Sequence, residues 1–322
     1  MGVRFWRGMT DLDRYLAELH ALGECSRTAC EELAQAEKQA FWAPTRYEVE
    51  YLPGLRKVGL AATDDVALQN VADLHIHTTA SDGGEVAAML ERASEQQLDA
   101  VAVTDHDTIE GAVEARRFAH RNKLALAVIP GVEVSTSEGH VGALFVMQAF
   151  PTGLPMHETI DLIHEAGGLA VAHHPFVPAT LELMTGQPLG VGERFLTLPF
   201  DAVEVTNAVP GIGTRSNIRT HQLVREAGCT LGFTGGSDAH HPSQVGKGLT
   251  FYAGNQGILS LRRGIELGTT MGAEAYWTTA EKFGYYARLV QRVFAPSIPP
   301  PPGVPRSRIA ALRRAFRARR SN

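Results

Sequence analysis

The sequence predicts an α/β protein whose strands form a mainly parallel sheet or barrel. Between residues 71 and 238, short apolar runs of strand length alternate with amphipathic stretches of helical periodicity, and this alternation is typical of βαβ units. Histidine and carboxylate residues follow nearly every apolar run, at the strand ends where α/β barrels carry their functional residues. The 322-residue length fits one large barrel with added segments at both ends.

Before the barrel, residues 10–41 show apolar residues at helical spacing, with Thr10 or Asp11 as a plausible N-cap. We therefore expect residues 1–70 to form an N-terminal helical extension and residues 71–294 to form the barrel. The expected helices include 85–97, 159–168 and a terminal helix around 275–294, and the expected strands are 71–77, 98–106, 125–134, 140–148, 168–175, 200–208 and 229–238.

After the barrel, residues 295–322 form a separate element. The segment 295–305 is rich in proline and predicts a stiff polyproline linker. Residues 306–322 contain seven arginines, with Ile309, Leu312 and Phe316 at helical spacing. This tail is either a solvated basic segment or a basic amphipathic helix that contacts nucleic acid or a membrane surface.

Composition and charge exclude several classes of protein. With 44% hydrophobic and 20% charged residues the chain is an ordinary globular protein. A formal net charge of −5 gives no overall attraction to nucleic acid or anionic membranes, so an anionic substrate must be bound by local positive charge. Three cysteines without zinc-finger spacing suit a reducing compartment, and no apolar run reaches the length of a membrane span. We expect a cytoplasmic protein.

The first motif that carries chemistry is DLHIHTTASDGG, residues 73–84. His75 and His77 stand two positions apart at a strand end, so both rings project to the same side and are able to bind one metal ion. Asp82 follows in the turn.

The second motif is VAVTDHDTIEG, residues 101–111. Burying Asp105, His106 and Asp107 without partners would cost several kcal/mol, so a metal ion or a dense hydrogen-bond network is needed. One of the two aspartates is expected to cap the helix that begins near Thr108, and His106 is the better ligand candidate.

Two further motifs follow in strands three to five. Glu133 stands among valines and its two oxygens could bridge two ions, whereas His140, at the start of the next strand, could also face solvent. His173 and His174 end a later strand, and because neighbouring residues of a strand point to opposite faces, only one is expected to reach the site.

The last motif is LGFTGGSDAHHP, residues 231–242. Asp238 and His240 share one side by the same two-residue spacing, and the glycines permit a close approach of the chain. His241 is the weaker ligand candidate.

Together the motifs DLHIHTTASDG, TDHDT, GVEV, AHHP and GGSDAH resemble those of the PHP family, named for polymerase and histidinol phosphatase, over about residues 71–270. The resemblance implies a distorted (β/α)7 barrel with a trinuclear centre of zinc, manganese or iron that hydrolyses phosphate esters. It implies a first ion on His75, His77, Glu133 and Asp238, a second on Glu133, His140 and His173, and a third on Asp82, His106 and His240. The chain carries no polymerase domains and looks like a stand-alone member.

A water activated by the metal ions would be the nucleophile, so no covalent protein nucleophile is needed. Asp105, His174 and His241 are the candidates for the acid that protonates the leaving group. Arg215, in a glycine-rich loop, is a candidate clamp for a substrate phosphate.

Three functions follow from these residues. The first is a phosphoesterase acting on a phosphate mono- or diester, such as a small metabolite, a nucleotide or an oligonucleotide end. The second is a metal-dependent hydrolase of carboxyl or carbamate esters. The third is a non-catalytic module that docks on nucleic acid or membrane through the basic tail.

Overall fold

The computed structural model describes residues 55–57, 70–178, 182, 186–210, 213–254, 257–275 and the isolated positions 282, 284 and 285. The predicted helices within 10–41, the proline-rich linker and the arginine-rich tail lie outside these residues. The strands are β1 (Leu55–Lys57), β2 (Asn70–Ile76), β3 (Ala100–Val103), β4 (Ala127–Thr136), β5 (Gly139–Leu144), β6 (Leu169–Ala172), β7 (Ala202–Asn207), β8 (Gly232–Gly236), β9 (Gly248–Tyr252) and β10 (Met271–Ala275). The helices are α3 (Val86–Glu95), α4 (Glu110–Asn122), α5 (Met156–Glu165), α7 (Gly213–Glu226) and α8 (Ile258–Glu266), with short 3-10 helices η1 (Gly192–Leu196) and η2 (Pro242–Gln244).

Strands β2 to β8 form a distorted seven-stranded barrel in chain order. β2, β3 and β4 are parallel, and so are β6, β7 and β8, which confirms the predicted α/β class and its mainly parallel sheet. The barrel is closed by a parallel bridge between Ile76 and Ala239. Here His77 N donates to Ala239 O over 2.9 Å, so the ends of β2 and β8 meet.

β5 is the exception, because it runs antiparallel to both of its neighbours. It follows β4 after a turn of two residues, and Thr136 pairs with Gly139 across that turn. Gly139 has a φ of +135°, a conformation that favours glycine. With no room for a crossover helix, β5 must return beside β4.

Three further strands extend the sheet beside β2. β9 and β10 are antiparallel to their neighbours, and β1 pairs with β10. Residues 55–57, expected within a helical extension, are therefore a strand of the sheet. Of the expected helix around 275–294, Ala275 is instead the last residue of β10, the described positions 282, 284 and 285 are helical, and the other residues lie outside the described part of the chain.

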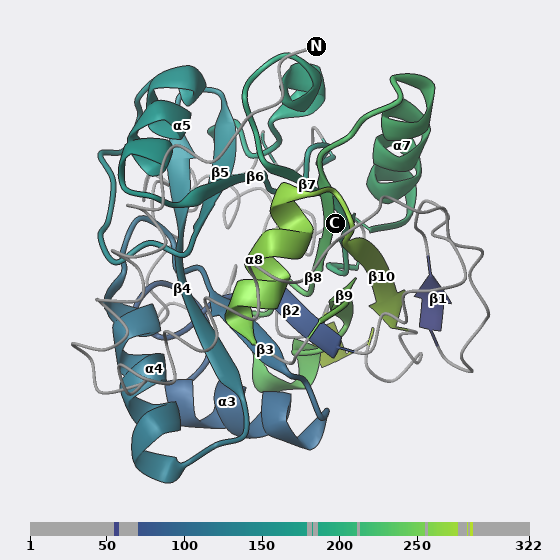
Figure 1. The fold of residues 1–322 in the computed structure, drawn as a ribbon. Coiled ribbons are helices and arrows are strands. Elements are labelled where there is room, and N and C mark those ends of the chain that lie inside the picture. Colours follow the sequence, from purple (N-terminus) through teal and green to yellow (C-terminus); the bar gives the residue numbers. More distant parts are fainter. Residues whose placement is uncertain are drawn as a thin grey trace, which may run out of the picture.

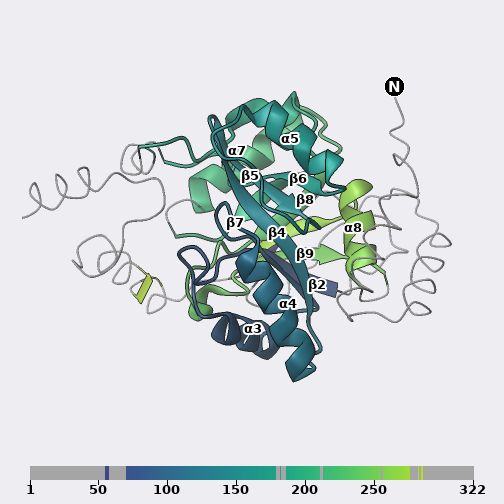
Figure 2. The same cartoon turned by 90° about the vertical axis from the view of Figure 1, so that its left-hand side faces the viewer.

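The amphipathic stretches form helices that cover the barrel. α3 buries Val86, Met89, Leu90 and Ala93, one face of a helix, and each fully buried large apolar side chain contributes roughly 1.5–3 kcal/mol. α5 buries its own apolar face in the same way. Both views show α3 and α4 at one end of the molecule and α5 and α7 at the other (Figures 1 and 2). Within the described residues, no helix is long and apolar enough to cross a membrane.

Candidate metal centre

Histidine and carboxylate side chains from separate strands converge at one end of the barrel. The strands deliver them because the carboxyl ends of β2, β3, β4, β6 and β8 meet there, and β5 adds a residue near its start. The side chains that meet are His75, His77, Asp82, His106, Glu133, His140, His173, His174, Asp238 and His240.

Four donor atoms form the tightest group. His75 Nε2 lies 3.1 Å from His77 Nε2, 3.3 Å from Glu133 Oε2 and 3.6 Å from Asp238 Oδ1. His77 Nε2 lies 3.4 Å from Glu133 Oε2 and 3.1 Å from Asp238 Oδ1. Four ligands arranged tetrahedrally at about 2.0–2.1 Å from one ion stand roughly 3.3 Å apart. These atoms therefore have the spacing of a metal-ligand set.

The other oxygen of Glu133 faces a second group of rings. Oε1 lies 3.2 Å from His140 Nδ1, 3.3 Å from His173 Nδ1 and 2.8 Å from His174 Nε2. Since Oε2 belongs to the first group, Glu133 stands between two sets of donors.

Both His173 and His174 reach Glu133, so the expectation that only one would do so is wrong. Strand β6 ends at Ala172, and His174 has a φ of +26°. The alternation of side chains therefore no longer applies at His174.

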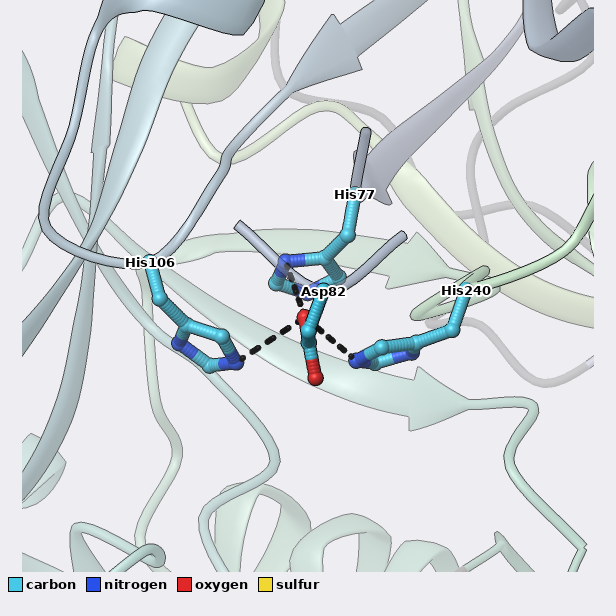
Figure 3. A group of neighbouring side chains, drawn as sticks. All are labelled: His77, Asp82, His106 and His240. Carbon is cyan, nitrogen blue, oxygen red and sulfur yellow. Dashed lines mark ion pairs between the residues drawn. The ribbon is translucent and has the colours of Figure 1, made fainter. Parts of the chain in front are cut away.

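A third group surrounds Asp82. Its Oδ1 lies 3.3 Å from His240 Nε2, 3.9 Å from His106 Nε2 and 4.0 Å from His77 Nδ1. Figure 3 shows this oxygen between the three rings. The group is more open than the first, since Asp82, His106 and His240 are partly exposed.

The protonation of His77 and that of Glu133 fit bound cations. Burial, then the rings of His240 and His106, lower the pKa of His77 to about 4, so this ring is neutral at pH 7. Burial opposes ionisation of Glu133, but the rings of His75, His106 and His140 hold its pKa well below the usual range. Neutral imidazole and ionised carboxylate are the forms that bind divalent metals.

Unsatisfied buried atoms point the same way. Among the residues that the structure describes, His77 Nδ1, Glu133 Oε2 and His140 Nε2 are buried without a hydrogen-bond partner. Each such atom costs roughly 1–3 kcal/mol, and a bound cation would remove this cost. The nitrogen and oxygen donors present therefore fit divalent ions.

Two residues that the sequence motifs did not single out form hydrogen bonds with the converging side chains. Glu204 Oε1 lies 3.1 Å from His75 Nδ1, and Glu204 Oε2 accepts from the backbone N of His174 over 2.7 Å. Asn207 Nδ2 donates to both Glu204 and Asp238. The available signal was a glutamate between two valines in β7, the pattern also seen at Glu133 in β4.

Asp105 and Asp107 hold loops in place. Asp105 accepts from Thr78 N and Ser81 Oγ at its Oδ1 and from Thr78 Oγ1 at its Oδ2. Asp107 accepts from Ser135 N and Oγ. The expectation that one of them caps the next helix is wrong, because α4 begins at Glu110 without a side-chain cap.

The two remaining candidates lie at the surface. His241 is exposed, and its Nδ1 accepts from Ser243 N at the start of η2. Arg215 is exposed in the first turn of α7. Neither belongs to the three donor groups.

An α/β barrel with histidine and carboxylate donors converging at the carboxyl ends of its strands defines the class of metal-dependent hydrolases. Residues 73–182 match the PHP domain, and residues 221–270 match the PHP-associated family. An uncharacterised protein of Methanocaldococcus jannaschii is 36% identical over 167 residues, which cover 48% of this chain and 92% of that protein. The chain belongs to the PHP family.

Other relatives are more partial. The 5'-3' exoribonuclease Rnm of Salmonella typhimurium is 42% identical over 96 residues, which cover 28% of this chain and 33% of the exoribonuclease. A Bacteroides vulgatus crystal structure, a two-domain protein containing a predicted PHP-like metal-dependent phosphoesterase, aligns with a TM-score of 0.50 and 17% identity over 77% of this chain and 74% of that one. This likeness supports the fold.

Proposed function

We propose that the protein hydrolyses phosphate mono- or diesters, with a small phosphorylated metabolite, a nucleotide or an oligonucleotide end as substrate. The observation that carries this proposal is the placement of Glu133, whose two oxygens face two different groups of donors. A carboxylate in this position suits a bridge between two divalent ions.

The ligand set follows from the three donor groups. His75, His77, Glu133 and Asp238 would hold one ion, Glu133 with His140 and His173 a second, and Asp82, His106 and His240 a third. Nitrogen and oxygen donors without thiolate suit zinc, manganese or iron. Bound ions would supply a water of lowered pKa as nucleophile and positive charge for the phosphate oxygens.

The chain itself supplies orientation and a proton. As water attacks phosphorus and the bond to the leaving oxygen breaks, that oxygen must gain a proton. Of the three acid candidates, Asp105 is engaged by Thr78 and Ser81 and His241 is exposed. We assign the role to His174, whose Nδ1 is buried without a hydrogen-bond partner among the described residues. Arg215 remains the proposed clamp for an outer phosphate oxygen.

The test combines metal analysis with hydrolysis assays on wild type, His77→Ala and the control His157→Ala, which changes an exposed histidine of α5. The substrates are p-nitrophenyl phosphate, bis-p-nitrophenyl phosphate, AMP and an aryl carbamate. We expect two or more equivalents of metal, and phosphoester cleavage that is lost only in His77→Ala. Cleavage confined to the carbamate would replace the proposal with carbamate hydrolysis. Protein that stays inactive with manganese, zinc or iron would overturn it.

A further inference from the structure

A cavity of about 620 Å³ is lined by the residues that directly follow His174, together with part of the segment before β7 and Arg219 of α7. Its walls include Phe176, Gly190, Arg194 and Arg219, which come from the segment after β6, the segment before η1, η1 itself and α7. The volume lies within the range of small-molecule sites, roughly 300–1,000 Å³.

The cavity walls are joined directly to the ligand-bearing strands. Phe176 follows His174 by two residues, and Gly192 N donates to Pro175 O over 2.8 Å. On the other side, His140 N donates to Leu189 O over 2.9 Å. Two lining residues, Pro175 and Gly190, thus adjoin His174 and the hydrogen-bond partner of His140 in the chain.

An arginine and an aromatic ring lie against each other in the wall of this cavity. The guanidinium carbon of Arg219 lies over the Phe176 ring, 4.0 Å from its centroid. One nitrogen of Arg219 also contacts Glu193 over 3.0 Å, so the guanidinium is held by its edge and by one face. The plane of an arginine held in this way is a surface on which a nucleobase stacks.

Arg219 is also held relative to the metal centre. Asn217, two residues before it in α7, accepts from Asn207 N and donates to Asn207 O. Asn207 in turn donates to Asp238. The helix that carries Arg219 is thus connected by side-chain hydrogen bonds to a proposed metal ligand.

The charges of the cavity favour a neutral aromatic group over a second phosphate. Arg194 forms an ion pair with Glu138, and Arg219 forms one with Glu193. The positive charge of each arginine is therefore balanced by a glutamate. A base needs a flat surface and hydrogen-bonding groups rather than net charge.

We propose that this cavity binds the nucleobase of a substrate whose phosphate lies at the metal centre. The proposal rests on the proposed phosphoesterase function and narrows its substrate class to nucleotides. Free mononucleotides and the ends of oligonucleotides share this chemistry, and the substrates of the test distinguish them.

The experiment compares kcat/KM for substrates with and without a base. AMP is paired with ribose 5-phosphate, which lacks the base. A dinucleotide of two adenosines is paired with the same dinucleotide in which hydrogen replaces the adenine bases. We expect wild type to prefer the base-bearing partner by about tenfold to a hundredfold, as stacking on one base allows. A preference confined to the AMP pair identifies a mononucleotide, and one confined to the dinucleotide pair identifies an oligonucleotide end.

Three variants test which residues are responsible. Phe176→Ala, Arg219→Ala and Arg219→Lys should each remove most of the preference, the last because lysine keeps the charge but lacks the plane. In these variants kcat/KM for the base-free substrates should change by less than about twofold. Arg225→Ala changes an exposed arginine of the same helix outside the cavity and should behave as wild type.

Equal kcat/KM for the two members of each pair in wild type would overturn the proposal. Variants that lower kcat/KM for all substrates by the same factor would also overturn it. A binding measurement separates this failure from failure of the proposed function. Adenosine has no phosphate, so saturation-transfer NMR with adenosine reports on the cavity even in a protein that cleaves no phosphate ester. Binding lost in Phe176→Ala supports the site, and no binding to wild type overturns it.

Discussion

His75 Nδ1 lies 3.1 Å from Glu204 Oε1 in the buried wall of the metal centre. Burial opposes ionisation of Glu204, but the ring of His75 lowers its pKa, so the ionised carboxylate accepts a hydrogen bond from the Nδ1–H of His75. Nε2 of His75 then faces His77 and Glu133, and it would be the ring nitrogen that holds a metal ion.

Glu204→Gln is therefore expected to weaken metal binding about tenfold to a hundredfold, the usual effect of losing a carboxylate behind a histidine ligand. Competition with a chelator measures the affinity. Glu226→Gln, an exposed change on α7, is the matched control. Unchanged affinity in Glu204→Gln would show that His75 keeps its orientation without this carboxylate.

Asp82→Asn should remove one ion and leave the others. Asp82 contacts His77, His106 and His240. The group around Glu133 Oε2 shares His77 with it but also has His75 and Asp238 as donors. Elemental analysis should show roughly one equivalent less than in wild type. Asp161→Asn, an exposed change on α5, should keep the full number. An unchanged metal content in Asp82→Asn would contradict the third site.

Asp105→Asn tests whether Asp105 is structural or catalytic. Because Asp105 accepts three hydrogen bonds from Thr78 and Ser81, we expect the free energy of unfolding to fall by about 1–3 kcal/mol, as measured by urea denaturation. The shape of the pH–rate profile should stay the same. Loss of its alkaline limb would instead identify Asp105 as the general acid.

His221 provides a pH dependence away from the metal centre. Burial, with the nearby Arg225, lowers its pKa to about 4, against about 6.5 in an unfolded chain. The unfolded state therefore binds more protons between these values, and stability is present above pH 6.5 and lost as the pH falls towards 4. Between pH 7.5 and 5, wild type should lose about 1–2 kcal/mol more unfolding free energy than His221→Gln, after allowance for partial exposure. Equal losses by urea denaturation would contradict the shifted pKa.

The strand ends show what could be predicted from local pattern. The two-residue spacing of His75 and His77, and of Asp238 and His240, predicted that each pair shares a side, and all four side chains lie in the donor groups. For His75 and His77, at the end of β2, strand geometry accounts for this result, because side chains alternate with a period of two. Asp238 and His240 lie beyond the end of β8 at Gly236, and Asp238 has a φ of +52°, so their convergence does not come from strand alternation.

His174 and Glu204 show where local pattern ends. His174 reaches Glu133 because its backbone leaves strand geometry, and the residue pattern does not specify that conformation. Glu204 has the same local pattern as Glu133, yet it lies behind His75 rather than among the converging donors. Neighbours distant in the sequence decide these positions.

The amino-acid sequence by itself determined the α/β class, the alternation of strands and helices and the residue types at the strand ends, because periodicity and composition are local properties. Only the tertiary structure decided that β5 runs antiparallel, that the ends of β2 and β8 meet at Ile76 and Ala239, and that Phe176 and Arg219 share one cavity. These relationships join residues far apart in the chain, and they depend on how the whole sheet closes and packs.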